Sequence, residues 1–238
     1  MDLIYNNSLE QDKSTYWEDV AKSKWGSYIT KVEERVILKA NELFIKPEKA
    51  LEVGCEGGRW SIMLTDSGWD MICTDINPNT LAKCQQRIPN AKCVLVKEDD
   101  TTLPCESESV NLILCLEVFN VLWNDWFITE AFRVLQDGGI IVGVFNNKLS
   151  FRGYFRHLIS SMKGQFDSYK VSYPKWRYKF CKQGFKMLYQ EGICWFPFTR
   201  DSNSPFIPIC TQLEYYLGLR RLSSLSPWVV FLAQKKKQ

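Results

Sequence analysis

Short apolar segments alternate with helical or turn-rich segments along the first 147 residues. Five apolar segments have the length and composition of buried strands, namely 50–55, 69–76, 91–98, 110–117 and 139–146. The intervening pattern predicts helices from the glycine cluster to Gly68, from Pro78 onward and over 123–135. Strands that alternate with helices are typical of a parallel sheet with both faces covered.

The flanking regions complete this pattern. Residues 29–45 place apolar side chains on one helical face, and the predicted helix ends before Pro47. Residues 148–175 are predicted to be helical and aromatic, and 176–183 form a further helix. Segments 186–196 and 227–234 add two strands, with an irregular polar insert that begins at residue 199. The chain is therefore predicted to be a doubly wound α/β protein with a mostly parallel, seven-stranded sheet.

Composition restricts the class of protein further. Hydrophobic residues make up 45% of the chain and charged residues 24%, which is ordinary for a folded globular protein and argues against disorder. No apolar stretch approaches the roughly 18 residues that a membrane span needs. The first residues, MDLIYNNSLEQDK, are polar and do not resemble a secretory signal. We therefore expect a cytoplasmic protein without a membrane span.

The nine cysteines favour the same compartment. None forms a Cys-x-x-Cys pair, their number is odd, and most lie in predicted strands or helices. Buried free thiols in a reducing environment are the expected state. The chain has one histidine, His157, and no metal site is predicted.

The net charge of +3 conceals an asymmetry between the two parts of the chain. Residues 1–147 contain 14 Lys+Arg and 23 Asp+Glu, a net charge of −9, whereas residues 148–238 contain 16 and 4, a net charge of +12. The two parts are therefore predicted to face different partners.

The segment LEVGCEGGRW, residues 51–60, indicates a ligand site at the end of the first strand. Gly54, Gly57 and Gly58 allow a ligand to approach the backbone, but their spacing is neither that of a dinucleotide site nor that of a P-loop. Glu56 adds a negative charge that would repel a pyrophosphate. A cationic nucleoside without phosphates would not be repelled, and S-adenosylmethionine is such a molecule.

Acidic residues follow the next two strands. Asp75 ends the second strand, 21 positions after Gly54, where a carboxylate can accept hydrogen bonds from both hydroxyls of a ribose. Asp99 and Asp100 end the third strand, where one of them could accept a hydrogen bond from an adenine amino group. A helix cap at Asp75 and a solvated acidic turn at 99–100 are the alternatives.

Four motifs in order, LEVGCEGGRWS, TDINP, EDDTTLPCESESVNLILCLEVF and EAFRVLQDGG, resemble class I S-adenosylmethionine-dependent methyltransferases. The most similar group includes small-molecule methyltransferases of quinone biosynthesis. The resemblance is dense from about residue 50 to 146. It implies a Rossmann-like fold in one domain over 1–238, with N-terminal cap helices at 1–46, a cofactor-binding core at 47–147, and a substrate lid with the final strands at 148–238.

The resemblance also implies cofactor-binding residues. The motif acid-x-Gly-x-Gly-x-Gly maps to Glu52, Gly54, Cys55, Glu56 and Gly58, with Glu56 in place of the middle glycine. Either the loop adjusts so that Glu56 approaches the methionine amino group of the cofactor, or Glu56 weakens cofactor binding. The remaining implied contacts are Asp75 with the ribose, Ile76, Asp99 and Asp100 with the adenine, and Cys115 and Leu116 with the methionine amino group. Tyr28, within YWEDVAKSKWGSYI, either covers the cofactor or belongs to the core.

Methyl transfer requires alignment, exclusion of water and, for a protonated acceptor, a base. The candidate bases are Glu117, His157, Tyr173, Asp167 and Tyr169, and Asn146 and Asn147 are candidate positioning groups. None of them stands out as the catalytic base.

The acceptor site is predicted within residues 148–216, which contain 17 aromatic residues, 11 Lys+Arg and 4 Asp+Glu. These residues either pack and solvate the insert, or form an apolar pocket with a positive rim for an anionic aromatic or acyl-like acceptor. The candidate contacts are Asn146, Arg152, Arg156, Lys170 and Arg200.

A small-molecule acceptor is the leading hypothesis. The fourth strand leads into CLEVFN and not into the Asn-Pro-Pro-Tyr type of motif, which argues against DNA. The basic, aromatic-rich C-terminal part keeps an RNA methyltransferase as an alternative. Glu56 keeps a second alternative, a homologue that binds the cofactor without catalysis. The pattern predicts no particular oligomeric state.

Overall fold

One seven-stranded sheet organises the chain in a computed structural model, which describes residues 14–163 and 169–237. The strand order is β3-β2-β1-β4-β5-β7-β6. Neighbouring strands from β3 to β5 are parallel, whereas β7 is antiparallel to both β5 and β6. The predicted mostly parallel sheet of seven strands is confirmed. The strands are β1 Lys49–Val53, β2 Asp70–Asp75, β3 Lys92–Leu95, β4 Val110–Cys115, β5 Leu135–Asn146, β6 Phe185–Ile193 and β7 Trp228–Lys235.

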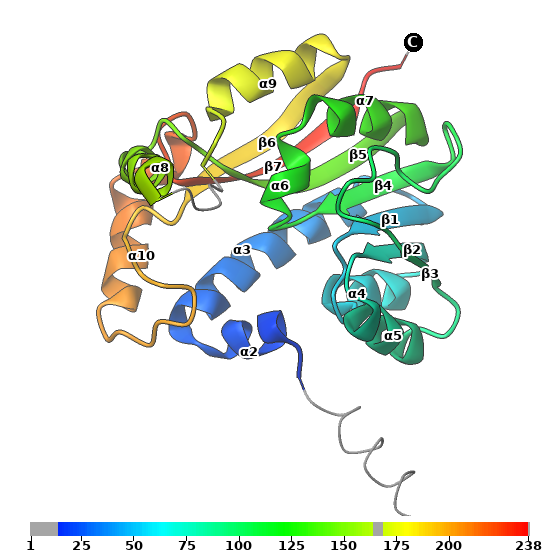
Figure 1. Cartoon of the computed structure of the whole chain (residues 1–238), viewed down its shortest axis with the longest axis horizontal. Helices are drawn as coiled ribbons and strands as arrows, with labels where there is room; N and C mark the ends of the chain where they lie inside the picture. The colour runs from blue at the N-terminus through cyan, green and yellow to red at the C-terminus, as the bar shows by residue number, and fades with distance from the viewer. Residues whose placement is uncertain (1–13, 164–168, 238) are drawn as a thin grey trace, which may run out of the picture.

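Helices cover both faces of the sheet (Figure 1). Those on one face are α3 (Lys24–Asn41), α4 (Arg59–Asp66) and α5 (Pro78–Arg87), and the other face carries α7 (Asp125–Val134) and α9 (Tyr173–Lys182). The shorter or peripheral helices are α2 (Tyr16–Lys22), α6 (Phe119–Leu122), α8 (Phe151–Lys163), α10 (Ile207–Tyr216) and the 3-10 turn η1 (Leu219–Arg221). Among the described residues, no helix is both long enough and apolar enough to cross a bilayer.

Each face of the sheet has its own hydrophobic core. The α3–α5 side buries Trp25, Val36 and Leu64 against side chains of the strands. The α7–α9 side buries Phe127, Trp176 and Phe180, and the indole of Trp176 donates a 2.9 Å hydrogen bond to the Leu122 carbonyl. Since burial of one large apolar side chain contributes about 1.5–3 kcal/mol, the two cores together hold the strand ends in fixed positions.

The N-terminal helices differ from the prediction over 29–45. The α3 helix begins earlier, at Lys24, because the Ser23 hydroxyl accepts a 3.0 Å hydrogen bond from the Gly26 amide and caps it. The preceding helix α2 begins where the Glu18 carboxylate accepts a 2.7 Å hydrogen bond from the Thr15 amide. The capped pair of helices therefore extends further toward the N-terminus than the apolar periodicity indicated.

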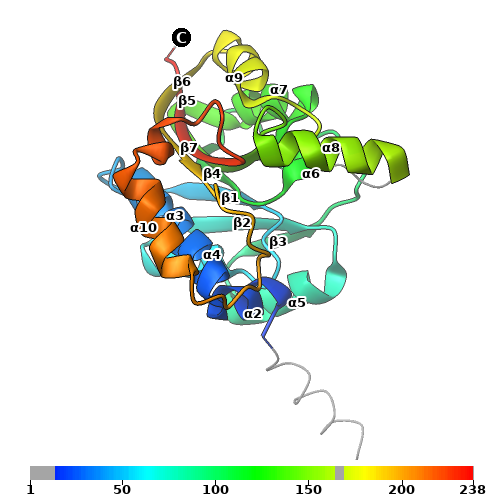
Figure 2. The ribbon, with the colours of Figure 1, turned by 90° about the vertical axis from the view of Figure 1, so that its left-hand side faces the viewer.

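The C-terminal part also departs from the prediction in places. The β5 strand begins at Leu135 and not at 139. Its pairing with β4 is irregular around Gly138 and Gly139. The irregular insert after residue 199 contains α10, which lies beside α3 (Figure 2). There the Tyr28 hydroxyl donates a hydrogen bond to the buried Glu214, which also accepts a 2.9 Å bond from the Trp195 amide.

Candidate functional site

A cleft lies beyond the carboxyl ends of β1, β2, β3 and β4. It has a volume of about 320 Å³ and adjoins a smaller compartment of about 60 Å³. The residues that line both compartments are Trp17, Gly54, Glu56, Glu117 and Val118. The larger cleft is lined by residues drawn from 53–56, 74–80, 96–104 and 117–126, together with Trp17. Ligands of open parallel sheets bind at this edge, so the cleft is the candidate functional site.

The glycine loop forms one wall of both compartments. The amides of Gly54 and Cys55 donate hydrogen bonds of 2.8 and 2.9 Å to the Thr74 carbonyl, which ties the loop to β2. Gly54 has a φ of +72°, and a Cβ atom there would lie 2.5 Å from a methyl carbon of Val118. Only glycine fits this position without displacing a residue that itself lines the cleft.

Glu56 adopts a backbone conformation that usually belongs to glycine. Its φ of +49° lies in the left-handed region, which costs a residue with a side chain roughly 1–2 kcal/mol. Its amide donates a 2.8 Å hydrogen bond to Oδ2 of Asp75, and its side chain lines both compartments. The loop therefore keeps the shape that a middle glycine would give it, with a carboxylate added.

The Asp75 carboxylate is held rigidly at the end of β2. Oδ2 accepts from the Glu56 amide and Oδ1 accepts from the Asn77 amide, each at 2.8 Å. Asn77 in turn caps α5 by accepting a 2.9 Å bond from the Asn79 amide. An ionised carboxylate has about four acceptor positions, so the two amides leave Asp75 with acceptor capacity toward the cleft that it lines.

The segment after β3 completes the larger cleft. Asp100 lines it and is oriented by a 2.8 Å hydrogen bond from the Lys97 amide, whereas Asp99 is exposed and does not line it. Glu98 is the second acid of this wall. Ile76 lines the cleft and is 56% exposed, so a large apolar side chain is left uncovered there. Val96, Leu103, Pro104 and Trp126 add further apolar surface.

The smaller compartment is acidic. Glu33, Glu52, Glu56 and Glu117 line it together with one arginine, Arg59. Glu52 is buried and accepts a hydrogen bond from the Ser61 hydroxyl, and burial raises its pKa to about 8. Cys55 and Leu116 provide part of the remaining wall.

Glu33, which is buried, and Glu117, which is mostly buried, form an acidic pair between α3 and the end of β4. Burial raises the pKa of both carboxyl groups, and for Glu33 the neighbouring Glu117 charge raises it further. The balancing cations are Arg59, whose Nη2 lies 3.5 Å from Glu33, and Arg200, whose Nη1 lies 2.8 Å from Glu117. Glu52 and Glu56 lie close by. Because burial favours the neutral forms of Glu33, Glu52 and Glu117, a cationic ligand in the compartment would favour their ionisation.

Arg200 lies in an aromatic cage beside this pair. Its guanidinium carbon is 4.3 Å from the ring centre of Trp17, 4.8 Å from that of Trp228 and 5.4 Å from that of Phe119. A guanidinium stacked on aromatic rings and paired with a carboxylate has a fixed orientation. Of the predicted acceptor contacts, Arg200 points inward toward Glu117.

Helix α2 is fastened over the glycine loop. The Trp17 amide donates a 3.4 Å hydrogen bond to Glu56, and the Trp17 side chain lines both compartments. Arg87 forms a 2.5 Å ion pair with Glu18 and donates a 3.0 Å hydrogen bond to the Gly57 carbonyl. These contacts join α2 and α5 across the loop. The capping sequence Thr15-Tyr16-Trp17-Glu18 is the signal that could have predicted this helix.

Some of the predicted cofactor residues lie outside the cleft. Tyr28 belongs to the contact between α3 and α10. Gly58 is the N-cap residue of α4 and packs against Cys84, and Cys115 is fully buried in β4. Strand β3 ends at Leu95, three residues before its predicted end, and the acids at 98 and 100, but not Asp99, line the cleft.

Most of the other candidates for acceptor binding and catalysis also lie elsewhere. Tyr173 is buried in the α7–α9 core, and its hydroxyl donates a 2.9 Å bond to Gln190. Asn147 is buried and bonds to four backbone groups, so it is a structural residue. Asn146 is buried, Arg152 donates a hydrogen bond to the Phe198 carbonyl, and Tyr169 accepts one from the Trp228 indole. Arg156 and Lys170 are exposed, and His157 lies on α8. None of these six residues lines the cleft, and Asp167 lies outside the described residues.

The sequence analysis missed Glu33 and Arg59. Glu33 lies on a helix whose apolar periodicity indicated only core packing, and Arg59 lies within the motif LEVGCEGGRWS but was given no role. They reach the smaller compartment because α3 and α4 pack side by side on the sheet, which a single sequence does not reveal.

The central part of the chain matches a known protein family. Residues 51–143 match the family described as a methyltransferase domain. An uncharacterised methyltransferase-like protein of Schizosaccharomyces pombe is 28% identical over 153 residues, which cover 63% of this chain and 57% of that relative. The match thus spans little more than half of the relative's length.

Solved structures with low sequence identity share the fold. A geranyl diphosphate methyltransferase solved in complex with GPP and sinefungin has a TM-score of 0.61 at 15% identity, covering 86% of this chain and 78% of that one. The [4+2]-cyclase SpnF has a TM-score of 0.61 at 12% identity, covering 92% and 84%. Because the second protein is named for a cyclisation, the shared fold alone does not define the reaction.

Proposed function

We propose that the protein, whose residues 51–143 match a methyltransferase domain, is a class I methyltransferase that transfers the methyl group of S-adenosylmethionine to a small organic acceptor. The observation that carries the proposal is the acidic two-part cleft at the carboxyl ends of the strands. The cysteine pattern supports a cytoplasmic location.

The adenosine half of the cofactor fits the larger compartment in this proposal. Asp75 accepts hydrogen bonds from the ribose hydroxyls with the capacity that its two amide bonds leave free. Ile76 and the apolar surface around Leu103 hold the adenine ring, and Asp100 accepts from its amino group.

The methionine half fits the smaller compartment. Its ammonium group lies among the carboxylates, near the backbone of Leu116, and its carboxylate pairs with Arg59. S-adenosylmethionine carries a sulfonium, an ammonium and a carboxylate, so its net positive charge would favour the ionised forms of these acids. A phosphate-bearing nucleotide would instead be repelled by Glu56.

The acceptor approaches from the side of Glu117 and Arg200. Its nucleophilic atom donates an electron pair to the methyl carbon while the carbon–sulfur bond breaks, and the sulfur leaves as the neutral thioether of S-adenosylhomocysteine. Glu117 is the candidate base because, of the proposed bases in the described part of the chain, it alone lines the cleft. Burial raises its pKa, which makes its carboxylate a stronger base.

A small acceptor is supported by the narrow, aromatic surroundings of the inner end of the site. Trp17, Phe119 and Trp228 enclose Arg200 there, and a flat organic molecule could stack among such rings. In this proposal Arg200 leaves its ion pair with Glu117 and pairs with a carboxylate or phosphate of the acceptor. The resemblance to quinone-biosynthesis methyltransferases supports the same class of acceptor.

Two measurements test the proposal. Isothermal titration calorimetry with S-adenosylmethionine and S-adenosylhomocysteine tests the cofactor site, and failure to bind either ligand would refute it. Incubation with methyl-labelled cofactor and a cell extract, followed by separation into a small-molecule filtrate, RNA and protein, tests the acceptor. We expect label in the filtrate. Label in the RNA fraction would establish the alternative acceptor, and binding without any transfer would indicate a non-catalytic homologue.

A further inference from the structure

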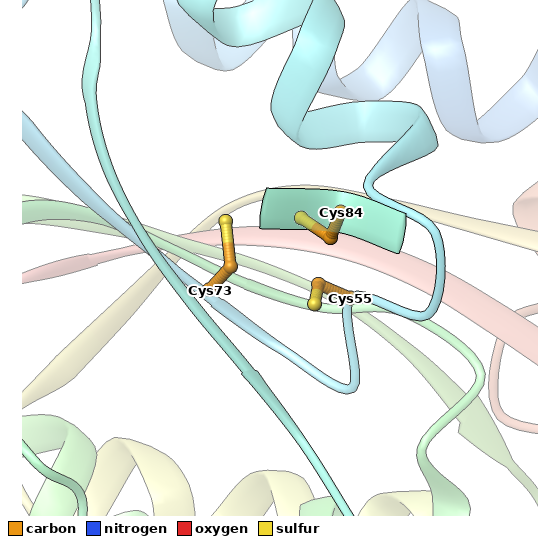
Figure 3. A group of neighbouring side chains, drawn as sticks. All are labelled: Cys55, Cys73 and Cys84. Carbon is orange, nitrogen blue, oxygen red and sulfur yellow. The ribbon is translucent and has the colours of Figure 1, made fainter. Parts of the chain in front are cut away.

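Three cysteines from separate segments meet behind the glycine loop (Figure 3). Cys55 follows β1, Cys73 lies in β2 and Cys84 lies in α5. Their Sγ atoms all lie within 4.8 Å of one another, and the three side chains are buried. No Cys-x-x-Cys spacing announces this group, because the fold and not the local sequence assembles it.

A fourth cysteine, Cys93, borders the group on its solvent side. It pairs with Cys73 in the register of the parallel strands β2 and β3, and it is half-buried. Burial raises the pKa of the Cys93 thiol, and hydrogen bonds to Cys73 and Cys84 also affect it. The Cys93 thiol is therefore close to two of the three inner thiols.

The spacing of the inner thiols suits a metal ion. A zinc–sulfur bond of about 2.3 Å places sulfur atoms about 3.8 Å apart in a tetrahedral site and about 4.0 Å apart in a planar three-coordinate one. The observed upper limit of 4.8 Å means that each pair needs to close by less than about 1 Å. Rotation of side chains can supply such a change without movement of the backbone.

We propose that Cys55, Cys73 and Cys84, with Cys93 as the fourth ligand, form a binding site for Zn²⁺. The soft thiolates select a thiophilic ion, and four sulfur ligands match the closed tetrahedral geometry of structural zinc sites. Binding releases thiol protons to solvent, and the ion balances two of the thiolate charges that would otherwise be costly in the core. Cys93 provides the route of entry.

The position of the site links it to the cofactor loop. Cys55 lies between Gly54 and Glu56, and the Cys84 thiol lies against Gly58. A bound ion would therefore join the loop, β2, β3 and α5, which are the segments around the adenosine compartment. It would stabilise the folded chain by binding the native state in preference to the unfolded one.

Titration of the reduced, chelator-treated full chain with Co²⁺ and then Zn²⁺ tests the proposal. We expect the absorption bands of tetrahedral thiolate-bound Co²⁺, their loss on addition of Zn²⁺, and about one zinc ion per chain after gel filtration. Bound Zn²⁺ should also raise the midpoint of thermal unfolding. Absence of the thiolate–cobalt bands in the reduced wild-type chain would overturn the proposal.

Two variants and a control make the test specific. Because loss of an outer-shell partner already costs about 10–100-fold in metal affinity, loss of a ligand in Cys84→Ala should weaken Zn²⁺ binding by at least about tenfold. If Cys84→Ala fails to fold, the half-buried Cys93→Ser is expected to show the same loss. The triple variant Cys105→Ala, Cys181→Ala, Cys210→Ala removes half-buried thiols elsewhere and should bind normally. Wild-type affinity in Cys84→Ala, or in Cys93→Ser, would show that other cysteines hold the ion.

Discussion

Loss of the Asp75 carboxylate is expected to cause a large decrease in cofactor affinity. Hydrogen bonds to a charged group contribute about 1.5–3 kcal/mol each, and the proposed site has two such bonds to the ribose. Since water compensates in part, Asp75→Ala should cost about 2–4 kcal/mol, which corresponds to about 30- to 700-fold weaker binding of S-adenosylhomocysteine in calorimetry.

Asp75 also holds the Glu56 amide, so a decrease in affinity could arise from the loop alone. An S-adenosylhomocysteine analogue that lacks both ribose hydroxyls separates the two effects, because Asp75→Ala then removes only the support of the loop. The variant should lose at least about tenfold more affinity for the natural ligand than for the analogue. Asp70→Ala, at the exposed opposite end of β2, is the control and should change affinity by less than about twofold. Equal losses for the two ligands, or affinity of Asp75→Ala within about threefold of wild type, would refute the ribose contact.

Three further predictions concern charged groups around the cleft. Glu56→Gln removes a negative charge from the cleft, so it should weaken binding of cationic S-adenosylmethionine more than that of neutral S-adenosylhomocysteine. For a separation taken as about 8 Å and an effective dielectric constant of about 40, the charge contributes about 1 kcal/mol, or about a fivefold difference in affinity. Equal weakening for the two ligands would contradict an electrostatic role. Because the folded-state pKa of Glu33 is raised, the wild type loses stability as pH rises from the unfolded value of 4.5 toward the folded one. Glu33→Gln should therefore raise the unfolding midpoint of the cofactor-free protein more at pH 8 than at pH 4.5, while the exposed Glu34→Gln should show no such trend. Once an acceptor is known, Arg200→Gln should raise its KM by at least about tenfold and leave cofactor affinity within about threefold, and an unchanged KM would leave Arg200 with a structural role only.

The part of the site that the sequence predicts best is the part made by contiguous residues. Strand ends, glycines and the acid at 75 follow local rules, because parallel strands carry their ligands at one edge and a tight loop there requires glycine. The same local rules place the end of the third strand three residues too late, at 98 and not at Leu95, since the end of a four-residue strand is not sharply encoded.

The part that the sequence does not predict arises from packing between distant segments. Arg200 meets Glu117, and Tyr28 meets Glu214, only after the insert folds against α3. An aromatic residue such as Tyr173 has the same composition signal in a core as in a binding pocket, and only its burial distinguishes the two.

The order in which the strands are made has a consequence for folding during synthesis. Strand β7 is synthesised after β6, yet it lies between β5 and β6 and pairs with both. Until β7 has left the ribosome, β5 presents an unpaired edge, and β6 has no partner in the sheet. We therefore expect nascent chains that end before residue 228 to be prone to aggregation and to depend on chaperones, even when their methyltransferase motifs are complete.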